Sequence, residues 1–306
     1  MTQGISGSGN YNLEEMRRAR PRSPKARAPI NADLCPDCDP GGGTPPPAGG
    51  SDPYFATARS RPENETGEAG VDLGSRNFNW GIPLVSLPGR AGMDLNIGIS
   101  YNSLVWTKQG NSIMFNADHG FPSPGFRLGV PKLQSTSVNQ DEQITSMLLI
   151  MPSGQRIALK QIGTSNVFES QDSSYVQAID TNGYFTNVLV RTTDGTQYTF
   201  TVGYCTKIQD RNGNYLTIGY NSNMQVSTVT DTLGRVVTFN YSGDFLTSIT
   251  QTWNGQTHVW ASFGYGSITP NTNFPTLNYF GPLTPITVLN QISLDDGSYY
   301  TFNYTS

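Results

Sequence analysis

The chain has 306 residues, of which 14% are charged, and its formal net charge is −4. Glycine (33 residues), proline (20 residues) and aromatic residues (11%) are prominent. Lysine and glutamate, which usually cover helix surfaces, are scarce, so the composition excludes a coiled coil or a compact helical protein and favours short strands joined by turns. No apolar run approaches the ~20 residues of a membrane span. The net charge gives no general attraction for nucleic acid. We therefore expect no membrane span and no nucleic-acid partner.

Residues 1–75 differ in character from the rest of the chain. Six basic residues lie between Arg17 and Arg27, prolines interrupt them, and a Gly/Pro-rich tract follows. Such a segment buries too little apolar surface to offset the entropy of ordering it, so we predict a disordered tail and linker. Cys35 and Cys38 have the spacing of a zinc or redox pair, but a four-ligand zinc site needs two more ligands, so we predict no metal. No apolar core follows the basic run, so no secretory signal is visible.

From residue 76 onward the sequence predicts an all-β protein. Apolar and polar residues alternate in short runs separated by turn signals, and no window of about twelve residues shows helical periodicity. The clearest strand candidates are 95–101, 147–151 and 188–190. We expect a β-rich domain over 76–200 and a set of repeats over 201–306.

The repeats are marked by glycines in turn contexts. Gly213, Gly234, Gly255 and Gly297 lie 21, 21 and 42 residues apart, so the period is 21 with one degenerate unit near position 276. Apolar residues at alternate positions follow each glycine and end on a tyrosine: Tyr220, Tyr241, Tyr265 and Tyr304. Aspartates precede three of the glycines: Asp210, Asp231 and Asp295. The pattern predicts antiparallel hairpins in one curved sheet, in which glycine takes a positive φ and aspartate accepts hydrogen bonds from turn amides.

The Gly255 unit keeps this pattern with a one-residue slip. Its apolar face is expected to comprise Val259, Ala261, Phe263 and Tyr265, which leaves His258 on the polar face of the sheet.

This unit resembles the RHS/YD repeat, with Gly234-Arg-Val-Val-Thr-Phe-Asn-Tyr241 as the closest match to its core. The segment from Gly81 to Ser103 is similar to the region that precedes the repeats in RHS proteins and toxin-complex shell subunits. The resemblance implies a spiral β-shell around a polypeptide toxin or effector, placed outside the cell or in its envelope. It also implies that this chain is the N-terminal portion of such a shell. Tyr300, Phe302 and Tyr304 would then be exposed on an unpaired edge strand.

Other candidate chemical groups have simpler structural interpretations. Cys205 occupies a repeat position that other units fill with valine or leucine, so we expect it in the core. His119 is expected in a surface turn, and the turn role of the repeated aspartates explains them better than calcium binding does. We therefore predict no catalytic, cofactor or metal site.

The function expected from the sequence is a non-enzymatic β-shell segment that encloses or presents a polypeptide, or pairs with the remainder of a longer shell. The first alternative is an adhesin or carbohydrate-binding module that contacts glycans through Trp106, Trp253 or Trp260. The second is a glycosidase-like enzyme, which would need two carboxylates about 5–9.5 Å apart.

Overall fold

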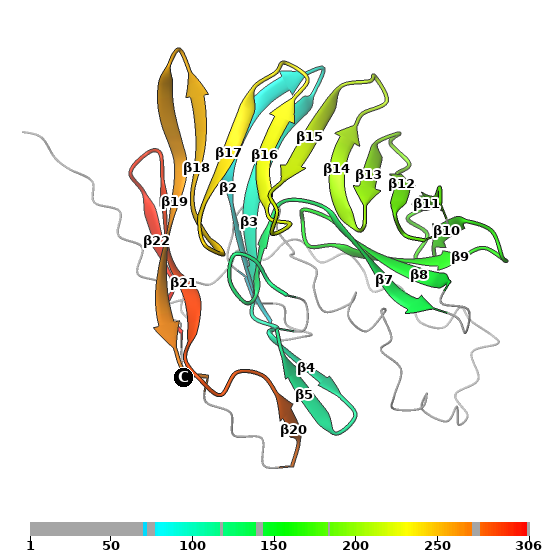
Figure 1. Cartoon of the computed structure of the whole chain (residues 1–306), viewed down its shortest axis with the longest axis horizontal. Coiled ribbons are helices and arrows are strands. Elements are labelled where there is room, and N and C mark those ends of the chain that lie inside the picture. The colour runs from blue at the N-terminus through cyan, green and yellow to red at the C-terminus, as the bar shows by residue number, and fades with distance from the viewer. Residues whose placement is uncertain are drawn as a thin grey trace, which may run out of the picture.

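The computed structural model describes residues 70–71, 77–116, 119–138, 143–182, 184–270 and 276–304. These residues form strands, turns and irregular segments, and none of them is helical. The predicted all-β class with repeated antiparallel hairpins in a curved sheet is confirmed (Figure 1). The predicted disordered tail lies outside the described residues except for a two-residue strand at 70–71.

The strands belong to three sheets. The N-terminal sheet has the order β1-β2-β3-β6 and comprises β1 (Gly70–Val71), β2 (Phe78–Arg90), β3 (Met93–Asn102) and β6 (Phe126–Leu128). The small sheet has the order β20-β5-β4 and comprises β4 (Trp106–Gln109), β5 (Ser112–Phe115) and β20 (Asn278–Phe280). The main sheet contains fifteen strands.

The first eight strands of the main sheet close into a ring. They are β7 (Lys132–Val138), β8 (Ile144–Ile150), β9 (Arg156–Gln161), β10 (Val167–Ser170), β11 (Gln177–Asp180), β12 (Asn187–Arg191), β13 (Gln197–Thr201) and β14 (Tyr204–Gln209). Each strand pairs with the next, and β14 closes the ring by pairing with β7 at Tyr204 and Lys132. Alternate side chains of these strands, including Leu159, Phe168 and Phe200, are buried in the core, as in other eight-stranded closed sheets whose interior is filled by side chains.

From β14 the sheet continues as a curved wall of hairpins, which we call the repeat wall. Its further strands are β15 (Tyr215–Tyr220), β16 (Val226–Asp231), β17 (Val236–Ser242), β18 (Phe245–Trp253), β19 (Gln256–Ile268), β21 (Ile286–Leu294) and β22 (Tyr299–Thr301). The strand order follows the chain to β22, which pairs only with β21 among the described strands. The ring thus closes one end of the main sheet, and β22 forms the free edge at the other end.

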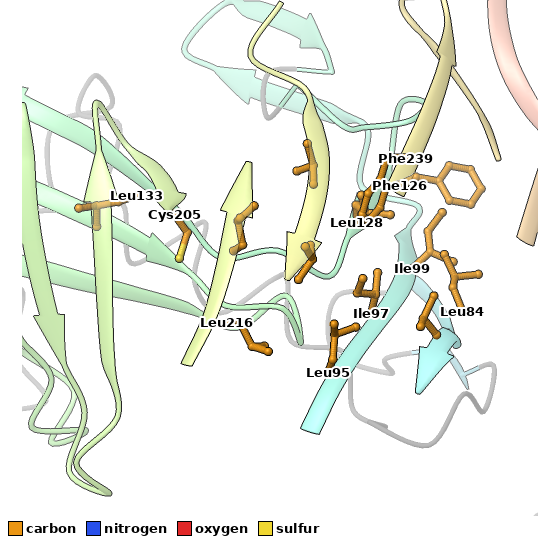
Figure 2. Packing of buried hydrophobic residues seen from close by; sticks show 14 of the residues in the cluster. Leu84, Leu95, Ile97, Ile99, Phe126, Leu128, Leu133, Cys205, Leu216 and Phe239 are labelled. Atoms are coloured by element: carbon orange, nitrogen blue, oxygen red, sulfur yellow. The ribbon is translucent and has the colours of Figure 1, made fainter. Parts of the chain in front are cut away.

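The N-terminal sheet packs against the apolar face of the repeat wall. Leu95, Ile97 and Ile99 on β3 share one buried cluster with Phe239 on β17 (Figure 2). Because this face is covered, the prediction that the last aromatic residues are exposed was wrong. Tyr300 and Phe302 are half-buried, with ring centroids 5.3 and 5.1 Å from that of Trp80 on β2.

Two features of the main sheet concern the divisions expected from the sequence. The boundary predicted near residue 200 lies inside one continuous sheet, because β13 and β14 pair directly across it. The degenerate unit expected near position 276 does not form a hairpin of the wall. Instead β20 pairs in parallel with β5, and β19 pairs directly with β21.

Candidate functional site

Six turns of the wall and ring share one five-residue geometry. The first residue donates its N–H to the carbonyl of the fifth, and the fourth donates its N–H to the carbonyl of the first. This pattern occurs at 151–155, 192–196, 210–214, 221–225, 231–235 and 294–298. The fourth residue has a positive φ, for example +77° at Gly234, which is the conformation that the turn interpretation requires. At 221–225 the fourth residue is Met224, so glycine spacing alone did not reveal that turn.

The turn aspartates use their carboxylates to cap backbone amides. Asp210 accepts hydrogen bonds from the N–H groups of Asn212 and Asn214 at 2.8 and 2.9 Å. Asp231 accepts bonds from Leu233 and Arg235 in the same way.

Asp295 does not have this role. In its turn the first position is Leu294, and the capping carboxylate belongs to Asp296, which accepts a bond from the N–H of Ser298 at 2.8 Å. The expectation that Asp295 caps the turn was therefore wrong by one residue. Its carboxylate instead lies 3.4 Å from Nε2 of His258.

These hydrogen bonds stabilise the ionised carboxylates. The side-chain amide of Asn214 is the largest cause that lowers the pKa of Asp210, and Ser298 has the same effect on the pKa of Asp296. A general acid needs a carboxyl that keeps its proton near neutral pH, which requires the opposite shift.

The repeat tyrosines bind backbone carbonyls. The hydroxyl of Tyr220 donates to the carbonyl of Cys205 and that of Tyr241 to the carbonyl of Val226, both at 2.8 Å. Tyr265 donates to Leu246 at 2.9 Å, and Tyr304 donates to Leu289. Burial raises the pKa of all four hydroxyls above the ordinary value of 10. This bond is the structural reason for the tyrosine that ends each repeat.

Each of these carbonyls lies beside a β-bulge. Val226 pairs with Tyr220, and Ser227 is the additional residue of the bulge. Equivalent bulges place Thr206, Thr247 and Asn290 beside the other three carbonyls. A bulge interrupts the ladder of backbone hydrogen bonds. The tyrosine of the following unit supplies a donor at that interruption.

Arg235, the arginine of the repeat motif, connects the wall to the N-terminal sheet. Its guanidinium lies 2.6 Å from the buried carboxylate of Asp231, whose side chain is 2% exposed. It also donates to the carbonyl of Pro88 on β2 at 2.6 Å. The motif thus fixes both the turn and the contact between sheets.

The Gly255 turn differs from these five-residue turns and explains the slip in the sequence. Trp253 pairs with Gln256, so only Asn254 and Gly255 form the loop, with φ of +49° and +71°. Two positive φ values with Asn-Gly identify a type I′ turn. The β18–β19 hairpin rises beyond its neighbours at the top of Figure 1.

Aromatic side chains gather near the tip of this hairpin. The imidazole centroid of His258 lies 4.8 Å from the ring of Trp253 and 4.6 Å from that of Trp260. We call Trp253, His258 and Trp260 the hairpin-tip cluster. The expectation that His258 lies on the polar face was wrong, because a bulge at Trp260 changes the alternation of side chains. Val259 is correspondingly 46% exposed and does not join Ala261 and Phe263 in the core.

The three tryptophans do not form one site. Trp106 lies on β4 in the small sheet, with its ring 4.9 Å from that of Phe115 and 5.7 Å from that of Tyr279. The small sheet lies at the opposite end of Figure 1 from the hairpin tip.

The other candidate residues have structural surroundings. Cys205 is fully buried, and burial raises the pKa of its thiol to about 12, so it is in the core as predicted. His119 is exposed in a turn, with φ of +49° and its N–H bonded to the carbonyl of Asn116. Cys35 and Cys38 lie outside the described residues.

Within the part of the chain that the structure describes, no three His, Cys, Asp or Glu side chains are grouped to hold a metal ion. Those same residues contain no helix that is long and apolar enough to cross a membrane. No protein-family model matches the sequence, and no curated protein matches it.

Proposed function

We propose that the chain is a non-catalytic β-scaffold of RHS/YD-repeat type that presents a polypeptide at the free edge of its main sheet. The observation that carries this proposal is the asymmetry of that sheet: among the described strands, the ring closes one end, and β22 has no second neighbour at the other. An open edge pairs readily with a further strand, whereas a closed ring has no edge. The N-terminal sheet covers the apolar face of the wall, which favours presentation at the edge over enclosure by these residues.

The turn chemistry supports a structural role. Carboxylates of the repeats cap turns, and the tyrosine hydroxyls close bulges, so these groups are already used by the fold. The half-buried rings of Tyr300 and Phe302 also leave the edge backbone next to a supported apolar surface.

The orientation of the edge backbone defines the binding groups. Phe302 donates its N–H to the carbonyl of Asn290 at 2.9 Å, so residue 302 faces β21. Because backbone groups of consecutive strand residues point in opposite directions, the N–H and C=O of Thr301 face the free edge. A polypeptide strand would bind there through its main chain.

A peptide test follows from the repeat. The tyrosine strand β19 pairs with β21, so a strand equivalent to β21 is the natural partner for the tyrosine strand β22. The probe is therefore a fluorescein-labelled peptide with the sequence of residues 286–294. We expect saturable binding to the whole chain by fluorescence anisotropy. A control peptide with serine in place of Leu289 and Ile292 keeps its main chain but loses the side chains that would face the core, and we expect weaker binding.

Two variants of the chain test whether the peptide binds at Thr301. Thr301→Pro removes the outward N–H, so it should abolish binding, and the inward bonds of Phe302 should keep the melting temperature close to that of the original chain. Thr301→Val retains the N–H and should bind normally. Equal binding of the peptide to the Thr301→Pro and Thr301→Val variants would overturn the proposal.

A further inference from the structure

The β18–β19 hairpin departs from the repeat at two points. Its type I′ turn replaces the five-residue turn that the other repeat units use at this end of the hairpin, which lengthens the hairpin and puts Trp253 near the tip. A bulge also makes Trp260 an additional residue between Val259 and Ala261. The recurrent bulges of the wall lie next to the repeat tyrosines, and this one does not. Local departures of this kind are expected at functional sites, and bulges redirect side chains there.

Both departures place an indole ring beside the same imidazole. Trp253 and Trp260 both contact the imidazole of His258, and their own centroids are 6.5 Å apart, so the three rings form a compact triangle. The indole N–H of Trp260 donates to Oε1 of the buried Gln251 at 3.3 Å. The backbone N–H of Asp295 donates to the carbonyl of Trp260 at 3.1 Å, which holds the Asp295 carboxylate beside the cluster. These contacts fix the cluster on the face of the hairpin that continues the core side of the wall.

Trp253 remains open to solvent although its neighbours hold it in place. It is 45% exposed, whereas Trp260 is half-buried. Gln256 is the cross-strand partner of Trp253, and side chains of such a pair lie on the same face of a hairpin. Gln256 is itself exposed. An exposed indole therefore lies beside an uncharged amide and near one carboxylate.

We propose that the hairpin-tip cluster binds a neutral sugar, with one face of the sugar ring stacked on Trp253. The C–H groups on that face are weakly positive and pack against the electron-rich face of an indole. Gln256 and Asp295 supply the donors and acceptors that sugar hydroxyls require. Asp295 also makes the surroundings unfavourable for a ligand that carries a negative charge.

A cationic ligand fits the cluster less well. Aromatic cages hold a quaternary ammonium group between their rings. Here the indole centroids are only 6.5 Å apart and each indole also contacts the imidazole of His258, so the three rings pack against one another and leave no gap for an ammonium group between them. The accessible surface is therefore the open side of Trp253, a platform of the kind that suits a flat sugar ring.

The test uses the whole chain with cellohexaose and lactose as sugar probes and choline as the cationic probe. Tryptophan fluorescence and saturation-transfer NMR would be followed up to about 10 mM ligand, which detects millimolar affinities. We expect saturable binding of at least one sugar, a loss of affinity of about tenfold or more in Trp253→Ala, and partial retention in Trp253→Tyr. Trp106→Ala is the matched control and should bind like the original chain.

Three results would overturn this inference: no saturation with either sugar, equal affinity in Trp253→Ala, or binding of choline in place of sugar. Circular dichroism spectra and melting temperatures of the variants exclude unfolding as the cause of a loss. The result is separate from the edge proposal, because the peptide binds at Thr301 and the sugar at Trp253.

Discussion

Replacing Tyr241 by phenylalanine tests whether the repeat tyrosines stabilise the wall through their hydroxyls. The substitution removes one oxygen atom and leaves the ring, so the bond to the carbonyl of Val226, 2.8 Å long, is lost without a large change in packing. Val226 is 9% exposed and lies at the bulge, where the ladder is interrupted. An acceptor left without its donor in such a place costs about 1–3 kcal/mol. Since Tyr241 is half-buried and water can reach part of the site, we expect about 1–2 kcal/mol.

Urea unfolding followed by circular dichroism measures this loss as a shift of the transition midpoint at constant slope. Tyr215→Phe is the matched control. Tyr215 lies on β15 of the same wall and is 37% exposed, so the substitution should change stability by less than about 0.5 kcal/mol. Tyr220 pairs with Val226, whose carbonyl Tyr241 binds, so the Tyr220→Phe and Tyr241→Phe losses should be non-additive. Equal unfolding free energies for Tyr241→Phe and the original chain would refute the role of the hydroxyl.

Three further predictions concern the turn, the contact between sheets and alkaline pH. Gly234→Val should lower the free energy of unfolding by about 2 kcal/mol, and Gly234→Asn should lower it clearly less. An added Cβ meets no atom within 4 Å, so the penalty comes from the φ of +77° alone. Equal losses of the two variants in urea unfolding would contradict this. Arg235→Ala should lower the free energy of unfolding by about 2–3 kcal/mol, because it leaves the buried Asp231 carboxylate without its cation. Arg235→Lys should recover part of the loss. An unchanged stability of Arg235→Ala would exclude this role of Arg235. The raised pKa values of the four bonded tyrosines mean that the folded state retains their protons longer than the unfolded state does. Their contribution to stability should therefore be constant below the ordinary pKa of 10 and fall above it by about 1.4 kcal/mol per pH unit for each tyrosine, and an unchanged urea midpoint at about pH 11 would contradict this.

The repeat wall was predictable because its information is local. Turn glycines recur at multiples of 21 residues and a tyrosine ends each repeat, and both positions reflect contacts within one hairpin or between neighbours. The ring was not predictable, because its closure depends on Tyr204 meeting Lys132, which lies far away in the chain. The position of the N-terminal sheet was also missed, since alternation identifies an apolar face but does not say which other face covers it.

The candidate site shows the same limit at the level of single residues. The sequence indicates Trp253 and Trp260 as possible glycan contacts. The alternation of side chains along the strand predicts the wrong face for His258, because the bulge at Trp260 has no clear sequence signal. The hydroxyl bonds of the tyrosines were missed because their partners are backbone carbonyls, which any residue type supplies. The Asn-Gly pair at 254–255 is a strong signal for a two-residue type I′ turn and could have explained the slip.

The most direct test of the edge-scaffold proposal is hydrogen exchange of the β22 amides with and without the peptide of residues 286–294. The proposal predicts slower exchange at Thr301, whose N–H faces the free edge, and little change at Phe302, whose N–H is already bonded to the carbonyl of Asn290. Unchanged exchange at Thr301 when peptide is in excess would contradict it.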